Sequence, residues 1–222
     1  MERKFDSDLT SLKEKLLRMA SLAEETISLA MRSLKDRDES LADKVFVIEK
    51  EVNRLDVEID QECMSLLALQ QPMAGDLRFI TSVMKSSVEL ERISDLSINI
   101  VERTLILLKS PILKPLIDLP HMASIAQKMV SDAVDAFVKR DDELARDVCR
   151  RDDEVDELYD QIFRELLTYM MQDTSYIARA VDLLLISRHL ERIADHATNI
   201  GEDVIYYVKG KTIKHHCEAG DM

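Results

Sequence analysis

The chain has 222 residues, 46% of them hydrophobic and 33% charged, and it contains only four glycines and four prolines. This length supports a buried core, and the scarcity of turn residues excludes a β-sandwich or an α/β sheet of the same size. The formal net charge of −13 argues against nucleic acid as a partner, because neutralising phosphates requires clustered lysine and arginine. The same charge is compatible with multivalent cations or a basic protein surface.

Targeting signals and cysteine motifs are absent from the sequence. The first residues, MERKFDSDLTSLKEKLL, contain no apolar segment typical of a signal peptide, and no stretch approaches the ~18 apolar residues of a membrane span. We therefore expect a cytoplasmic protein. Its cysteines, Cys63, Cys149 and Cys217, show no CxxC spacing, so the sequence indicates neither a disulfide framework nor a thiolate zinc site.

The first half of the chain predicts three long helices. Residues 6–35 place apolar side chains at steps of three and four, which is the helical pattern. Asp38 can cap the next helix, whose apolar positions continue as far as Ile59. Pro72 breaks the chain, and a third helix is expected from about Leu77 to Lys109.

The second half repeats this order after a proline-rich connection. The segment SPILKPLIDLP holds three of the four prolines, and helices are expected near 119–139, 141–171 and 175–208. The expected domain organisation is a first three-helix unit, a linker, a second three-helix unit and a flexible tail, at residues 1–110, 111–120, 121–209 and 210–222.

An internal repeat relates the two halves. LERISDLSIN begins at Leu90 and LERIADHATN at Leu190, while upstream Arg37-Asp38 pairs with Arg140-Asp141 and Glu51-Val52 with Glu154-Val155. The offset between the halves changes from 103 to 100 residues around one loop, where QQPMAGDLR at 70–78 stands opposite the shorter QDTSYIAR at 172–179. Collinear matches on both sides of one deletion indicate duplication. We therefore predict an all-α fold of two tandem three-helix bundles related by pseudo-twofold symmetry.

Carboxylates continue the apolar stripe of the last helix in each unit. Side chains four residues apart lie on one helix face, about 5–6 Å apart at Cβ, so two can reach one hard cation. The last helices offer Glu91 with Asp95 and Glu191 with Asp195, and the middle helices offer Glu49 with Asn53 and Asp152 with Asp156. Such a set suits iron, manganese, zinc or magnesium. The alternative, a solvated charged face, stays open from spacing alone.

Other chemistry is not indicated. His189 and His196 flank the second motif, but Glu89 and Leu96 stand at the matching positions of the first unit, so a structural role is favoured over metal ligation. His215, His216 and Cys217 could chelate a metal opportunistically. No Gly-rich phosphate loop, Ser/His/Asp set or nucleophile elbow is present, so we expect no catalytic residues and no enzyme activity.

Several of these segments resemble the PhoU family along essentially the whole chain. The most specific is LALQQPMAGDLR at residues 67–78, and the two Glu-x-x-x-Asp elements, the two-unit layout and KPLIDLP add to it. The resemblance implies two three-helix bundles whose carboxylate motifs bind iron, zinc or manganese. By position, the implied ligands are Glu49, Asn53, Glu91 and Asp95 in the first unit and Asp152, Asp156, Glu191 and Asp195 in the second. The neutral amide of Asn53 departs from the acidic pattern and weakens the first site.

The resemblance also implies a role in phosphate homeostasis. A PhoU-like protein is expected to repress the phosphate-starvation response and phosphate uptake when phosphate is abundant. It would act in signal transduction as an adaptor between a phosphate ABC transporter, through its ATPase subunit, and a sensor histidine kinase. A homodimer that reaches the membrane only through these partners is expected. The alternatives are a metal-dependent carboxylate enzyme and a purely structural helical scaffold.

Overall fold

The computed structural model describes residues 4–210, and these residues form helices without any β-strand. The first unit contains α1 (Lys4–Asp36), α2 (Glu39–Gln70) and α3 (Ala74–Leu107). The second unit contains α4 (Asp118–Lys139), α5 (Asp142–Arg150), α6 (Asp152–Gln172), the short 3₁₀-helix η1 (Thr174–Tyr176) and α7 (Ile177–Lys209). The all-α prediction is confirmed.

The turn after the first helix has the same construction in both units. Arg37 and Arg140 adopt left-handed backbone, each with φ of 56°. The next residue then caps the following helix: the Asp38 carboxylate accepts from the Ser40 N–H at 2.9 Å, and Asp141 accepts from the Glu143 and Leu144 N–H groups. The expected cap at Asp38 is confirmed, and the matched Arg-Asp pairs of the repeat are helix stop and start signals.

The helix expected over 141–171 is not continuous, so this prediction is wrong. It breaks at Arg151 into α5 and α6. The Arg151 N–H lies 3.2 Å from both the Asp147 and the Val148 carbonyl oxygens, so the last turn of α5 is tightened. The Arg151 side chain contacts Asp132 of α4, a partner that local periodicity could not reveal.

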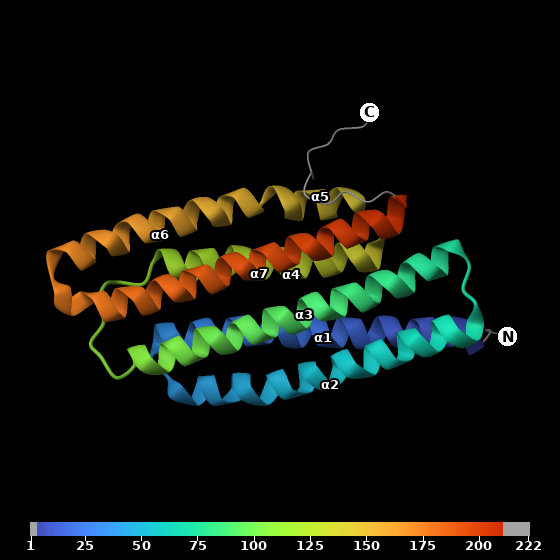
Figure 1. The fold of residues 1–222 in the computed structure, drawn as a ribbon, viewed down its shortest axis with the longest axis horizontal. Helices are drawn as coiled ribbons and strands as arrows, with labels where there is room; N and C mark the ends of the chain where they lie inside the picture. Colours follow the sequence, from blue (N-terminus) through green and yellow to red (C-terminus); the bar gives the residue numbers. More distant parts are fainter. Residues whose placement is uncertain (1–3, 211–222) are drawn as a thin grey trace.

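Helices contact their own equivalents where the two units meet. Besides the contacts within each unit, α1 packs against α4 and α3 against α7. Figure 1 shows these four helices between α2 at one edge and α5 and α6 at the other. Contacts between equivalent elements are what a twofold relation produces, so the predicted pseudo-symmetry is confirmed.

A single hydrophobic core crosses the boundary between the units. It contains Leu16 and Ile100 from the first unit and Met129 and Ile200 from the second, all at most 2% exposed. The connection between α3 and α4 packs on this core through Leu113 and Leu116. In residues 4–210, no helix is both long and apolar enough to cross a membrane. Apart from Gly210, the tail expected from residue 210 onward lies outside the described residues.

Candidate functional site

The acidic residues predicted in the second unit gather where α6 packs against α7. Burial raises the pKa of Asp152 to about 7, and the negative charges of Asp195 and Asp156 add to the shift. Negative charges on both α6 and α7 therefore raise the pKa of Asp152. Asp152 stands in the first turn of α6, directly after the break at Arg151. The break thus sets where the first acidic residue of this cluster lies.

Raised pKa values extend to the rest of the cluster. Burial raises the pKa of Glu191, and Asp195 and Asp156 raise it further. The pKa of Asp156 is raised by burial and by Asp195, and that of Asp195 is raised by burial despite the opposing charges of His196 and Arg192. Within residues 4–210, the ion pairs made by α6 and α7 involve other acidic groups: Glu165, Asp182, Asp203 and, on partner helices, Glu89 and Asp142. Among residues 4–210, none of the four carboxylates of the second cluster therefore forms an ion pair with a lysine or arginine.

Part of this cluster borders a surface hollow of about 600 Å³. Asp152 and Asp195 line it together with Arg192, His196 and Glu202. A cation could reach these two carboxylates from solvent through this hollow.

The equivalent cluster in the first unit lies between α2 and α3. Burial raises the pKa of Glu91, with further contributions from Asp95, Asp56 and Glu49. The Asn53 amide donates a hydrogen bond to Glu49, which the carboxylate at Asp156 cannot imitate in the second unit. Arg92 Nε lies 3.7 Å from Glu91 Oε2. The first cluster is therefore partly compensated by its own neighbours.

Asp56 is a member of this first cluster that the sequence analysis missed. Its Oδ1 atom is buried without a hydrogen-bond partner, as is Oδ1 of Asn53. Its signal in the sequence was its position three residues after Asn53, which places both on one face of α2. Unpartnered buried oxygens carry a desolvation cost that a bound cation would offset.

The donor chemistry of both clusters fits a hard cation, but the side chains are not closed around one. In residues 4–210, no three His, Cys, Asp or Glu side chains converge closely enough to hold a metal ion as they stand. Carboxylate oxygens are nevertheless the ligands that hard cations prefer, and a bound cation would offset both the burial and the repulsion that raise these pKa values. Binding would therefore be accompanied by side-chain rotation.

Of the two histidines beside the second cluster, His196 contacts the first unit and His189 is partly buried. His196 Nδ1 lies 2.6 Å from Glu89 Oε2, and Asn199 donates to the same oxygen at 3.1 Å, so this contact joins α7 to α3. Burial would raise the pKa of Glu89, but hydrogen bonds from His196 and Asn199 outweigh it and lower the pKa. Burial, with nearby arginines, lowers the pKa of His189 to about 4.

The cysteines and the terminal histidines add no described metal site. Cys63 and Cys149 are buried and form no disulfide, and burial raises the pKa of Cys63 to about 12. The candidate chelators His215, His216 and Cys217 lie outside the described residues.

Comparison with known proteins matches each unit to the same domain. The family model described as "PhoU domain" matches residues 16–104 and again residues 119–204. The chain belongs to the PhoU family. The first match contains both halves of the first acidic cluster, and the second match contains those of the second cluster.

Relatives within the PhoU family cover nearly the whole chain. A protein named "Phosphate-specific transport system accessory protein PhoU homolog" from Aquifex aeolicus is 41% identical over 212 residues, which are 96% of this chain and 96% of that protein. The Escherichia coli protein named "Phosphate-specific transport system accessory protein PhoU" is 34% identical over 211 residues, covering 95% of this chain and 88% of that protein. Both relatives are named as accessory proteins of phosphate-specific transport.

Solved PhoU structures have the same fold. The crystal structure of PhoU from Pseudomonas aeruginosa is 40% identical, covers 94% of this chain and 100% of its own, and superposes with a TM-score of 0.89. The phosphate transport system regulatory protein PhoU from Streptococcus pneumoniae is 29% identical, covers 95% and 100% of the two chains, and gives a TM-score of 0.86.

Proposed function

We propose that this protein is a non-enzymatic, cytoplasmic negative regulator of phosphate uptake and of the phosphate-starvation response. The observation that carries the proposal is the similarity over nearly the whole chain to proteins named as accessory to phosphate-specific transport, at 34–41% identity. No described residue set favours turnover of a substrate over this role.

The protein would act as an adaptor between the ATPase subunit of a phosphate transporter and a sensor histidine kinase, as a homodimer that meets the membrane only through its partners. Apolar side chains exposed at two tips support this role. Leu69 and Met73, at the turn from α2 to α3, are 75% and 80% exposed, and Met171, near the turn from α6 to α7, is 81% exposed. Figure 1 places these turns at opposite ends of the molecule, so each can contact a different protein.

Transition metals, iron, zinc or manganese, would bind at the two acidic clusters. The second cluster would use Asp152, Asp156, Glu191 and Asp195, and the first would use Glu49, Asn53, Glu91 and Asp95. A bound cation would supply positive charge that offsets the repulsion among these carboxylates. The residues themselves would orient oxygen ligands from two helices, so that metal binding would fasten the middle helix of each unit to the last helix.

The adaptor role can be tested by capture of purified components. The immobilised protein should retain both the transporter ATPase subunit and the cytoplasmic part of the histidine kinase from the same organism. Met73→Glu and Met171→Glu should each weaken retention of one of them, since a charge at an apolar contact is costly. Val47→Glu is the matched control for Met73→Glu, because Val47 is also exposed but lies near the other end of α2 from Met73. Retention of neither component by the unmodified protein would contradict the adaptor role.

A further inference from the structure

Two arginines from different units hold the connection between α3 and α4. Arg37, at the end of α1, donates to the carbonyl oxygens of Leu108 and Ser110 at 2.7 and 2.9 Å. Arg179, near the start of α7, donates to the Pro111 carbonyl oxygen at 3.0 Å. Figure 1 shows the connection at the end of the molecule where α7 begins. Because both guanidiniums bond to neutral carbonyl groups, these contacts leave their positive charges uncompensated.

A buried lysine fixes the far side of the same connection. Lys114 is only 5% exposed, and its ammonium group pairs with Glu165 of α6 and lies 3.6 Å from Asp118 Oδ2 of α4. The backbone from Leu108 to Lys114 is therefore tied to α1, α4, α6 and α7. A surface that is fixed in advance binds a partner with little further loss of conformational entropy.

Two lysines add positive charge beside the arginines. Lys35 and Arg37 line the same hollow of about 40 Å³ under the connection. Lys109 follows Leu108, whose carbonyl group binds Arg37. Both lysines are exposed, and neither forms an ion pair among residues 4–210. Together with Arg179, this end of the molecule carries four cationic side chains without an acidic partner.

The acidic groups around these cations are already bonded to other groups. Asp38 and Asp173 accept capping hydrogen bonds from backbone N–H groups. The ion pairs formed here are Asp36 with Arg32, Asp182 with Arg103, and Asp118 and Glu165 with Lys114. The four cations therefore form an area of positive charge on a chain whose formal net charge is −13.

Exposed apolar side chains lie on the same connection. Ile112 lines the hollow together with Lys35 and Arg37 and is 62% exposed. Ile117 follows Leu116, another residue of that hollow, and is 71% exposed. We call these two isoleucines, with Lys35, Arg37, Lys109 and Arg179, the connection patch. Exposed apolar groups rimmed by charge are typical of a protein interaction site.

We infer that the connection patch binds a short acidic segment of a partner protein that also carries apolar side chains. Carboxylates of the segment pair with the four cations, and its apolar side chains cover Ile112 and Ile117. A short segment can contact the patch alone. An anionic membrane would also face the exposed Glu39 of the neighbouring turn and the overall negative charge of the chain. The inference does not depend on the proposed regulatory role, since it names a surface and the chemistry of its partner.

Fluorescence anisotropy of a labelled probe peptide can measure this binding. The probe is a peptide of about 12 residues, built of glutamate and leucine, added to the full-length protein. Lys35→Glu with Lys109→Glu should weaken binding about tenfold or more, because attraction is replaced by repulsion. Lys44→Glu with Lys50→Glu is the matched control: both lysines are exposed on α2, and the net charge changes equally. Equal weakening by the two pairs, or no binding to the unmodified protein, would overturn the inference.

Two further measurements test the apolar contact and the class of partner. Ile112→Ser with Ile117→Ser should weaken probe binding more than Val47→Ser with Val57→Ser, a pair that is also exposed. Equal effects of the two pairs would overturn the role of the isoleucines. Sedimentation with phosphatidylglycerol vesicles should retain no protein. Retention that is lost with Lys35→Glu and Lys109→Glu would assign the patch to a membrane and overturn the inference.

Discussion

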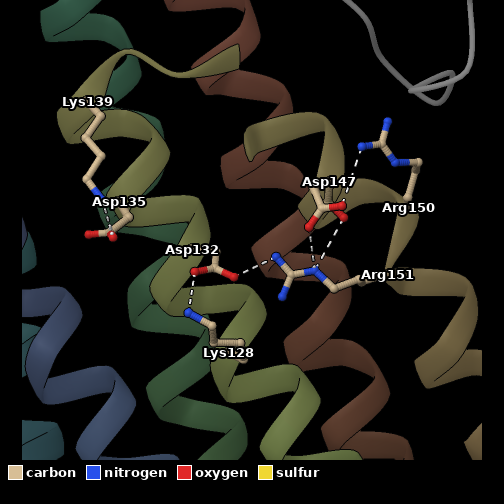
Figure 2. Close-up of polar contacts among 7 residues, drawn as sticks. All are labelled: Lys128, Asp132, Asp135, Lys139, Asp147, Arg150 and Arg151. Atoms are coloured by element: carbon tan, nitrogen blue, oxygen red, sulfur yellow. Dashed lines mark hydrogen bonds and ion pairs between the residues drawn. The ribbon is translucent and has the colours of Figure 1, made fainter. Parts of the chain in front are cut away.

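Arg151 Nη2 lies 2.7 Å from Asp132 Oδ2, and this contact joins the break between α5 and α6 to α4 (Figure 2). Asp132 is only 8% exposed, and its other oxygen lies 2.6 Å from Lys128 Nζ. Burial would raise the pKa of Asp132, but its hydrogen bonds to Lys128 and Arg151 outweigh burial and lower it. Arg151 Nε also lies 3.2 Å from Asp147 Oδ2, so one guanidinium links two acidic groups.

We predict that Arg151→Ala lowers the free energy of unfolding by about 1–3 kcal/mol, because it leaves the buried Asp132 carboxylate with one partner fewer. Arg150→Ala is the matched control. Arg150 is exposed and, among residues 4–210, forms an ion pair with Asp147 alone, at 3.4 Å, so its loss should change stability by less than about 0.5 kcal/mol. Urea denaturation of the two variants measures the difference. Equal stability losses would contradict a special role for Arg151.

The break at Arg151 is a part of the fold that the sequence did not predict. Periodicity, the caps and Pro72 were sufficient for the helices and the repeat, because those signals are local. Arg150 and Arg151 favour helix continuation, and the apolar spacing runs on to Val155, although Asp152 and Asp153 have low helix propensity. At the break, Arg151 contacts Asp132, which is on another helix, and the position matching Asp132 in the first unit is Leu29. No local pattern carries that information.

The pKa of Asp152 leads to a pH prediction for the metal-free protein. Its folded-state pKa of about 7 exceeds the unfolded value, so between these values the folded state holds a proton that the unfolded state has released. Stability should therefore fall as pH rises from about 4 to about 7, and the penalty is complete above that. Asp152→Asn should remove part of this slope and stabilise the metal-free protein near pH 8 by about 1 kcal/mol, since solvent screens a half-buried group.

Thermal or urea unfolding in the presence of a chelator checks this prediction at several pH values. Glu157→Gln is the control, because Glu157 is an exposed carboxylate of the same helix and is not among the charges that act on Asp152. The same slope for the unmodified protein and for Asp152→Asn would show that repulsion at this carboxyl group does not affect folding.

The two acidic clusters should differ in metal content. The four carboxylates of the second cluster form no ion pair with lysine or arginine among residues 4–210, whereas in the first cluster the Asn53 amide donates to Glu49 and Arg92 Nε lies 3.7 Å from Glu91 Oε2. Glu191→Ala with Asp195→Ala should therefore lower bound metal more than Glu91→Ala with Asp95→Ala. Elemental analysis of protein purified without a His tag measures this, with circular dichroism as the folding control. Equal losses of metal in the two double variants would show that the clusters do not differ in affinity. Absence of metal from the unmodified protein would contradict both sites.

The acidic clusters were predicted from the sequence in outline but not in detail. The repeat and the four-residue spacing predicted which helices would meet, and the structure brings Asp152 and Asp156 together with Asp195. Asp56 was missed, because the repeat places Tyr159 at its matching position and so offered no second copy to compare. The contact between Glu89 and His196 could not be predicted from the sequence either, since it joins residues of different units.

The most direct test of the proposed function is the transcription of phosphate-uptake genes in a strain that lacks this protein, grown with abundant phosphate. The account predicts that these genes are expressed as though phosphate were scarce, and that a plasmid copy of the unmodified protein restores repression. Expression that stays at the repressed level in the deletion strain would contradict the account.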